Sequence, residues 1–289
     1  IGMSAVNWPK VGQIVASWLT SPLLAGVIAF AIFQFTRKMI LDRSEPLAQV
    51  RKLGPFFFFF VFFVIGLVTL FKGLKNLNLD LDLPQAVLGS ALLGLLGAGV
   101  GKFFIGRVST GEPDPNHRFS QVERVFVVLQ ILTACAVAFA HGSNDVANSI
   151  GPLAAIASAV GGSEIASKAP VAPWMLAIGG VGIVIGLATW GYRVMETVGK
   201  RITELTPSRG FAAELAAATT IVLASRLGIP VSTTHTLVGA VLGVGLARGI
   251  GAIDLRVVGQ IMASWVATLP IAAGLSVFFY FFFKGLLTP

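Results

Sequence analysis

The 289-residue chain is 55% hydrophobic and only 12% charged, with a net charge of +8 and a mean hydropathy of +0.84. About a quarter of the residues of a soluble domain are charged. The composition of this chain therefore excludes a soluble globular domain and indicates an integral membrane protein. The basic residues lie in short loops between apolar segments, which is typical of membrane topology and does not indicate nucleic-acid binding. The single cysteine, Cys135, excludes a disulfide within the chain and a cysteine-based metal site.

Six apolar segments have the roughly 20 residues that a bilayer crossing requires. They are residues 11–35, 54–71, 84–105, 174–192, 211–227 and 257–283. Two further segments are expected to be broken: residues 122–160 at His141-Gly142-Ser143, and residues 230–247 at their entry through Gly228 and Pro230. The phenylalanine-rich block at 56–63 is interpreted as a lipid-facing surface.

Loop charge predicts the orientation of these segments. Basic residues gather in residues 37–52, 102–124 and 193–209, and two arginines mark residues 248–256. Because cytoplasmic loops are enriched in Lys and Arg, these four loops are expected inside. Residues 72–83 and 161–172 carry few or balanced charges and are expected outside.

A seven-residue sequence occurs twice. Residues 12–18 (GQIVASW) match residues 259–265 (GQIMASW) at all but one position, and each copy continues to a proline, Pro22 or Pro270. The loop charges send the two copies in opposite directions. Inverted repeats of this kind are typical of secondary transporters, whose substrate and ion sites lie near the membrane midplane at the repeat interface.

The repeat also predicts the domain organisation. We expect residues 1–36 to be the end of a truncated first repeat, 37–121 to be connecting spans and cytoplasmic loops, and 122–289 to be a second repeat that carries the binding motifs. A long stretch with both polar motifs precedes the second copy, and almost nothing precedes the first. We therefore expect that an N-terminal segment with partner motifs is missing from this sequence, which begins with Ile1.

The first motif, residues 141–152 (HGSNDVANSIGP), places polar groups in the middle of apolar sequence. An aspartate at a helix centre in the membrane costs about 2.5–3.5 kcal/mol on insertion scales, so the default interpretation is a substrate or ion site. With Ser143 as the N-cap of a second half-helix, residues four apart share one face and their polar stripe lies near a helix start that attracts anions. The stripe comprises Asn144, Asp145, Asn148 and Ser149.

The second motif is residues 230–236 (PVSTTHT). Proline begins helices well because its missing N–H would be unpaired there, and Ser232, Thr233 and Thr234 then supply hydroxyls. Gly239 and Gly243 follow in a small-residue pattern that allows close helix packing. The motif is therefore predicted to be the tip of a helical hairpin that carries a row of hydroxyls.

Neither motif contains Lys or Arg, although each favours an anion. An anion beside Asp145 would be repelled by about 4 kcal/mol at 4 Å and an effective dielectric constant of 20. That repulsion has to be offset by cations or protons that enter with the anion. Carboxylate, amide and hydroxyl oxygens are suitable ligands for Na⁺, so coupled transport follows from electrostatics.

These residues resemble the inorganic phosphate transporter (PiT) family of cation-coupled phosphate symporters. Residues 141–149 resemble the family's G-x-N-D-V-A-N signature and residues 230–235 its P-V-S-T-T-H element. The resemblance implies a homodimer and Na⁺ or H⁺ as the coupling ion, with no cofactor. Phosphate would be bound by Asp145, Asn148, Ser232, Thr233 and Thr234, and Na⁺ by Asn144, Asp145, Ser149 and Thr234.

The sequence therefore predicts an all-α polytopic membrane protein with inverted-topology repeats, broken helices and re-entrant hairpins. Its predicted function is symport of inorganic phosphate with Na⁺ into the cell by alternating access, across the plasma (inner) membrane. The alternatives are an H⁺-coupled phosphate or sulfate permease of the same family and, in another class, an anion channel. His141 and His235 are interpreted as packing or capping residues more readily than as ligands. An intramembrane hydrolase built on Ser232 is disfavoured, because the chain lacks a G-x-S-x-G element.

Overall fold

The computed structural model describes residues 6–70, 81–107, 118–160 and 171–287, and these ranges form helices and short connections without a strand. Six helical segments of the described chain are long and apolar enough to span a membrane. The all-helical, multi-pass architecture predicted from hydropathy is confirmed.

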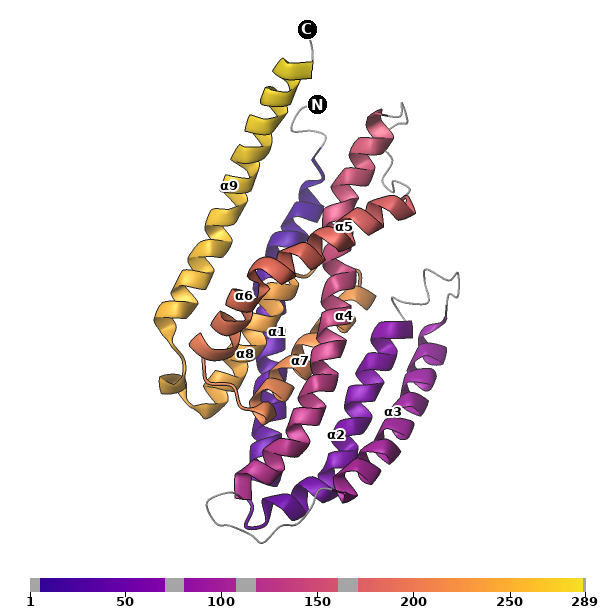
Figure 1. Cartoon of the computed structure of the whole chain (residues 1–289), viewed down its shortest axis with the longest axis vertical. Helices are drawn as coiled ribbons and strands as arrows, with labels where there is room; N and C mark the ends of the chain where they lie inside the picture. The colour runs from indigo at the N-terminus through magenta and orange to yellow at the C-terminus, as the bar shows by residue number, and fades with distance from the viewer. Residues whose placement is uncertain (1–5, 71–80, 108–117, 161–170, 288–289) are drawn as a thin grey trace.

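Most of the helices, labelled as in Figure 1, are longer than their predicted apolar segments, whereas α5 and α8 are shorter. They are α1 (Trp8–Thr36), α2 (Pro46–Val68), α3 (Leu83–Gly106), α4 (Arg118–Val160), α5 (Pro173–Gly186), α6 (Tyr192–Glu196), α7 (Pro207–Arg226), α8 (Thr233–Arg248) and α9 (Leu255–Leu287). Wider π-helical turns extend α1 to Leu41 and flank α6. Prolines open α2, α5 and α7, where the missing N–H has no intrahelical partner to lose.

The two helices that carry the repeated sequence run in opposite directions. In Figure 1, α1 descends from the N-terminus, and α9 ascends to the C-terminus at the same end of the molecule. This antiparallel course agrees with the orientation that the loop charges predict for the two copies.

The core lies between α1, α2, α4, α7 and α8. Phe57 and Phe58 of α2 are buried in it, and the Phe57 ring meets those of Phe211 and Phe126 with centroids 5.4 and 5.9 Å apart. The lipid-facing interpretation of the phenylalanine block is therefore wrong for these two residues. Phe56 and Phe60, on the other side of the helix, are exposed as that interpretation expected.

Helices α7 and α8 form a hairpin that enters and leaves at the same end of the molecule (Figure 1). At its tip, Gly228 adopts a φ of +67°, a conformation that glycine accepts at little cost. The segment at residues 211–227 was expected to cross the membrane, but α7 is not among the helices that are long and apolar enough to do so, and it forms one arm of this hairpin. The hairpin tip predicted at residues 230–236 is confirmed, because α7 ends at Arg226 and α8 begins at Thr233.

Small residues let α8 approach α1 closely. A Cβ atom on Gly239 would meet the backbone of Pro22, and one on Gly243 would meet the carbonyl oxygen of Gly26. Near the C-terminal ends of both helices, the Arg37 guanidinium donates a 3.0 Å hydrogen bond to the Ala247 carbonyl. The packing role predicted for Gly239 and Gly243 is confirmed, and it fixes the hairpin against α1 along its length.

The predicted break in residues 122–160 is wrong. Helix α4 continues from Arg118 to Val160 through His141-Gly142-Ser143, so Ser143 is inside a helix and caps none. A glycine costs only about 1 kcal/mol in a helix interior. Breaking the helix in apolar surroundings would leave several backbone groups without hydrogen bonds, at several kcal/mol each. The continuous helix is therefore the cheaper arrangement.

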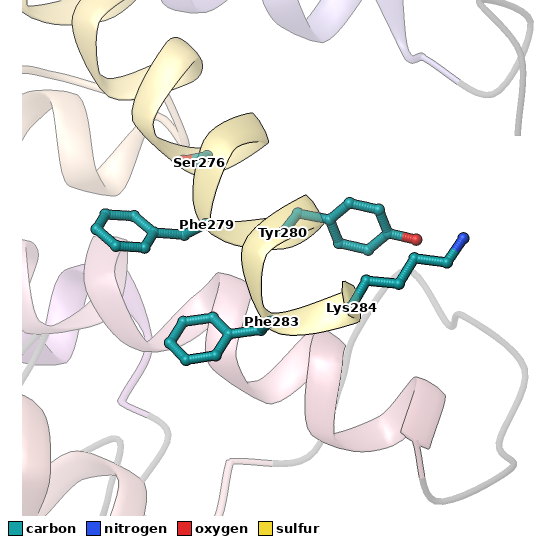
Figure 2. Close-up of a pocket in the computed structure, with 5 residues that line it drawn as sticks. All are labelled: Ser276, Phe279, Tyr280, Phe283 and Lys284. Carbon is teal, nitrogen blue, oxygen red and sulfur yellow. The ribbon is translucent and has the colours of Figure 1, made fainter. Parts of the chain in front are cut away.

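Helix α9 differs from the other long helices because it has little protein around it. Over residues 255–286, no side chain is buried, and the aromatic end, residues 278–283, is exposed. Figure 2 shows a shallow hollow on this helix, with Phe279 and Phe283 on one side and Tyr280 and Lys284 on the other. All five lining residues come from α9 alone, so the hollow is a surface feature of one helix.

Candidate functional site

Asp145 of α4 lies at the centre of the polar contacts between α4 and the hairpin tip. One carboxylate oxygen is 2.6 Å from Nε2 of His141, one turn earlier on the same helix. The Thr233 hydroxyl, from the first turn of α8, donates to the same carboxylate at 3.1 and 3.3 Å. Both side chains of the His141–Asp145 pair remain 35% exposed, so the carboxylate is reachable and is not sealed inside the core.

Ser232 sets the geometry of the hairpin side. Its side-chain oxygen caps α8 by accepting a 3.3 Å hydrogen bond from the His235 N–H, and its carbonyl accepts from Thr236. This cap begins the helix at Thr233, whose side chain is buried and faces Asp145. The helix N-terminus that comes to Asp145 is therefore that of α8, and it carries the partial positive charge that the sequence reading had assigned to α4.

The predicted site residues are distributed unevenly. Asp145 and Thr233 are in contact, and the Asn144 amide donates to Asp145 at 3.4 Å. Ser232 acts as a cap, and Thr234 is exposed at the start of α8. Asn148 and Ser149 lie on α4, one turn beyond Asn144 and Asp145, and their side chains fall outside the described part of the structure.

A second carboxyl group lies between α4 and α7. Glu214 accepts a 2.7 Å hydrogen bond from the Thr133 hydroxyl, and Gln130 also hydrogen-bonds it. Glu214 is not among the site residues predicted from the sequence. Its neighbours along α7, Ala213 and Leu215, are buried. In the sequence, a single carboxyl group within an apolar segment was the signal that could have identified Glu214 as a buried polar residue.

Two tryptophans also reach the hairpin. Trp265 of α9 stacks on the His235 ring with centroids 3.7 Å apart, and Trp18 of α1 meets the same ring edge-on at 6.5 Å. The sequence reading used both tryptophans to align the repeat and gave them no role in the site. Their identical position in the two copies was the signal that could have drawn attention to them.

Near these residues, a groove of about 1120 Å³ lies between α1, α8 and α9. Apart from His235 and Thr268, its lining side chains are apolar or aromatic, and neither Asp145 nor Thr233 contributes to it. The groove therefore lies beside the polar site and is separated from it by the first turn of α8.

The polar site has the chemistry of a hard-cation or anion site. Within the described ranges, no group of three His, Cys, Asp or Glu side chains gathers as a metal cluster would. Carboxylate, hydroxyl and amide oxygens are ligands that alkali and alkaline-earth cations prefer. The α8 N-terminus beside them adds N–H groups that favour an anion.

Comparisons with known proteins agree with this chemistry. A model of the family described as "Phosphate transporter family" matches residues 1–276. A Haemophilus influenzae protein named "Putative phosphate permease" is 46% identical over 97% of this chain and 67% of its own length. A similarly named protein of Thermococcus kodakarensis is 44% identical over 96% of the chain and 67% of its own length. The chain thus spans about two thirds of the length of these relatives.

A solved structure is similar over nearly the whole chain. It is titled "The sodium-dependent phosphate transporter" and is 37% identical, with a TM-score of 0.85 over 99% of this chain and 70% of the solved one. At this identity and score, the likeness extends to the arrangement of the helices as well as to the sequence.

Proposed function

From the premise that this chain belongs to the phosphate transporter family, we propose that it carries inorganic phosphate into the cell together with Na⁺, by alternating access. The family is one of transporters, so an enzymatic role for Ser232 is set aside. We propose the plasma (inner) membrane as the location of this multi-pass protein and a homodimer as its assembly.

The observation that carries the proposal is the contact between Asp145 and Thr233 at the α8 N-terminus. The hydroxyl and the helix N-terminus favour an anion, whereas the carboxylate repels one. A cation bound at the carboxylate removes that repulsion, so anion and cation stabilise each other at one place. A site of this kind binds phosphate well only when the cation is present, and this is the thermodynamic requirement for symport.

The roles proposed for individual residues follow from their groups. Phosphate is bound by hydroxyl and amide donors with Asp145 beside them, and Na⁺ by oxygen ligands that share that carboxylate. The proposed phosphate ligands are Asp145, Asn148, Ser232, Thr233 and Thr234, and the proposed Na⁺ ligands are Asn144, Asp145, Ser149 and Thr234. A protonated phosphate oxygen can donate to Asp145, whereas sulfate has no proton at neutral pH to donate.

The proposed division of the chain assigns residues 1–36 to the end of a first repeat, 37–121 to connecting spans, and 122–289 to a second repeat with the binding motifs. Opposite orientation of α1 and α9 supports this division (Figure 1). In alternating access, one repeat rocks against the other around the site at which the ions bind.

The test is uptake of radiolabelled phosphate into proteoliposomes that contain the purified protein. We expect uptake to require an inward Na⁺ gradient, to persist when proton ionophores collapse the pH gradient, and to be inhibited by arsenate but not by sulfate. Uptake that follows the pH gradient and ignores Na⁺ would contradict Na⁺ symport and favour proton coupling.

Two further outcomes decide the remaining alternatives. Inhibition by sulfate but not by arsenate would identify a sulfate permease. Large unitary currents in planar bilayers, with a reversal potential set by the anion alone, would identify an anion channel. Symport predicts neither result.

A further inference from the structure

Three rings from three helices meet beside the polar site. His235 lies in the first turn of α8, Trp18 on α1 and Trp265 on α9. The imidazole is stacked on Trp265, with ring centroids 3.7 Å apart and planes 26° apart, and it meets Trp18 edge-on at 6.5 Å and 70°. Trp18 and Trp265 are the final residues of the two repeated sequences, so the two copies present the same side chain to one histidine.

Ring contacts and the Trp18 backbone hold the imidazole in place. A backbone group of Trp18 hydrogen-bonds His235. In the part of the chain that the structure describes, Nδ1 of His235 is buried without a hydrogen-bond partner. A buried polar atom left in this way requires an explanation. The stacked Trp265 indole fixes the imidazole by its face and supplies no hydrogen bond to that nitrogen.

His235 is tied to Asp145 through one turn of helix. The His235 N–H donates to the Ser232 side chain, which caps α8, and the next residue, Thr233, donates to Asp145. The His235 backbone, the Ser232 cap and Thr233 belong to the same helical turn, so a change in the position of this turn moves the Thr233 hydroxyl relative to Asp145.

Trp265 also ends the partly buried part of α9. Val257, Val258, Ile261 and Trp265 of α9 are partly buried against the core. From residue 266 to residue 286, every side chain of α9 is exposed. Trp265 is thus the last partly buried side chain in residues 255–286, and it is the one that stacks on His235 of α8.

We propose that His235 is a positioning residue for phosphate binding: clamped between the two repeat tryptophans, it sets the start of α8 so that the Thr233 hydroxyl meets Asp145. The role rests on the proposed phosphate transport. It differs from ligation, because His235 acts through Thr233 and needs no contact with phosphate or Na⁺.

The experiment compares phosphate uptake by His235→Gln, His235→Phe and Trp265→Leu in proteoliposomes. Losing the stack is expected to raise the KM for phosphate about fivefold, with Vmax within about twofold of the unsubstituted protein. His235→Phe retains a planar ring between the tryptophans and should therefore keep a near-normal KM. Trp174→Leu, at an exposed tryptophan on α5, is the matched control and should change neither quantity.

Combining His235→Gln with Trp265→Leu sharpens the test. If the two residues act through one contact, the double variant has a KM no higher than the worse single variant. A KM equal to the product of the two single effects would overturn the proposal, as would His235→Phe being as impaired as His235→Gln. Trp265→Leu and His235→Phe keep the test decisive if His235→Gln fails to fold.

The outcomes separate this role from the proposed function. Absence of uptake by the unsubstituted protein would overturn phosphate transport and, with it, the role assigned to His235. Normal Na⁺-driven uptake with an unchanged KM in both His235→Gln and Trp265→Leu would overturn the role of His235 alone.

Discussion

Helices α1 and α9 carry almost the same seven residues, yet they are packed very differently. Ser17 of α1 is 2% exposed and lies against the hairpin, whereas Ser264, its counterpart on α9, is exposed. Both hydroxyls make the same local bond, to the carbonyls of Ile14 and Ile261 at 2.6 and 2.7 Å. The repeated sequence thus determines that both segments are helical and that they form the same local hydrogen bonds. Which of their side chains are buried depends on the helices packed against them.

The partner of α1 is α8, which also brings Thr233 to Asp145. The packed side of the molecule therefore contains the polar site, and α9 meets that side only near its start and through Trp265. If this contrast governs function, equivalent substitutions on the packed side and on α9 should have unequal effects.

The largest difference is expected between Asp145→Asn and Asp254→Asn. Asp145 supplies the negative charge proposed to bind Na⁺, whereas Asp254 caps the start of α9 by accepting from the N–H groups of Arg256 and Val257. Removing the Asp145 charge should lower Na⁺-driven phosphate uptake about 100-fold, since a unit charge nearby is worth several kcal/mol at intermediate dielectric. Asparagine still caps a helix, so Asp254→Asn should transport normally.

Initial rates of radiolabelled phosphate uptake, normalised to protein in the vesicles, provide the measurement. Equal uptake by the two variants would mean that the contrast between the polar site and α9 has no functional meaning. If Asp145→Asn retains phosphate uptake but loses its dependence on Na⁺, Asp145 is required for cation coupling and not for phosphate binding.

A matched pair of glycines tests the packing itself. Gly26 and Gly274 each follow the proline of their repeat by four residues, but only Gly26 has a neighbour: a Cβ there would lie 3.0 Å from the Gly239 carbonyl oxygen. Gly26→Val should destabilise the protein by about 2 kcal/mol and lower Tm by about 5 °C. Gly274 has open space around it, so Gly274→Val should leave Tm unchanged or slightly raised.

Thermal unfolding of the two variants in the same detergent gives this comparison directly. A Tm lowered equally by both substitutions would show that α9 is packed as closely as α1, contrary to the structure.

A smaller effect is expected from threonine hydroxyls. Thr133 of α4 donates to the Glu214 carboxylate at 2.7 Å, and Thr268 of α9 donates to the carbonyl of Trp265 at 3.1 Å in an exposed position. Thr133→Val removes one partner of a carboxyl group at a helix interface and should cost about 1–2 kcal/mol. Thr268→Val should stay within about 0.5 kcal/mol, as surface substitutions usually do. The same unfolding assay separates the two, and a greater loss at Thr268 would contradict the burial pattern.

Much of the fold could be predicted from local sequence. Apolar length predicted the spans, and Gly228 with Pro230 predicted the hairpin tip. The starts of helices were less accurate: α2 begins at Pro46 instead of residue 54, because an amphipathic first turn adds helix without adding hydropathy. The break at His141 was wrong because a polar motif was taken for a helix end, although the i and i+4 pairing of His141 with Asp145 fits a continuous helix.

The candidate site was less predictable because its contacts are non-local. The motifs identified Asp145 and Thr233 separately, but 88 positions separate them in the chain and only the fold brings them together. The same applies to Thr133 with Glu214 and to Trp18 and Trp265 with His235. The hydrophobic periodicity of one segment does not show which side chains of a distant segment will contact it in the folded protein.

The most direct test of cation-compensated phosphate binding is entry of radiolabelled Na⁺ into proteoliposomes, measured with and without external phosphate. We predict that phosphate stimulates Na⁺ entry in the unsubstituted protein and that Asp145→Asn abolishes this stimulation while Asp254→Asn preserves it. Phosphate that enters without any accompanying Na⁺, with the Asp145 carboxylate intact, would contradict the proposal.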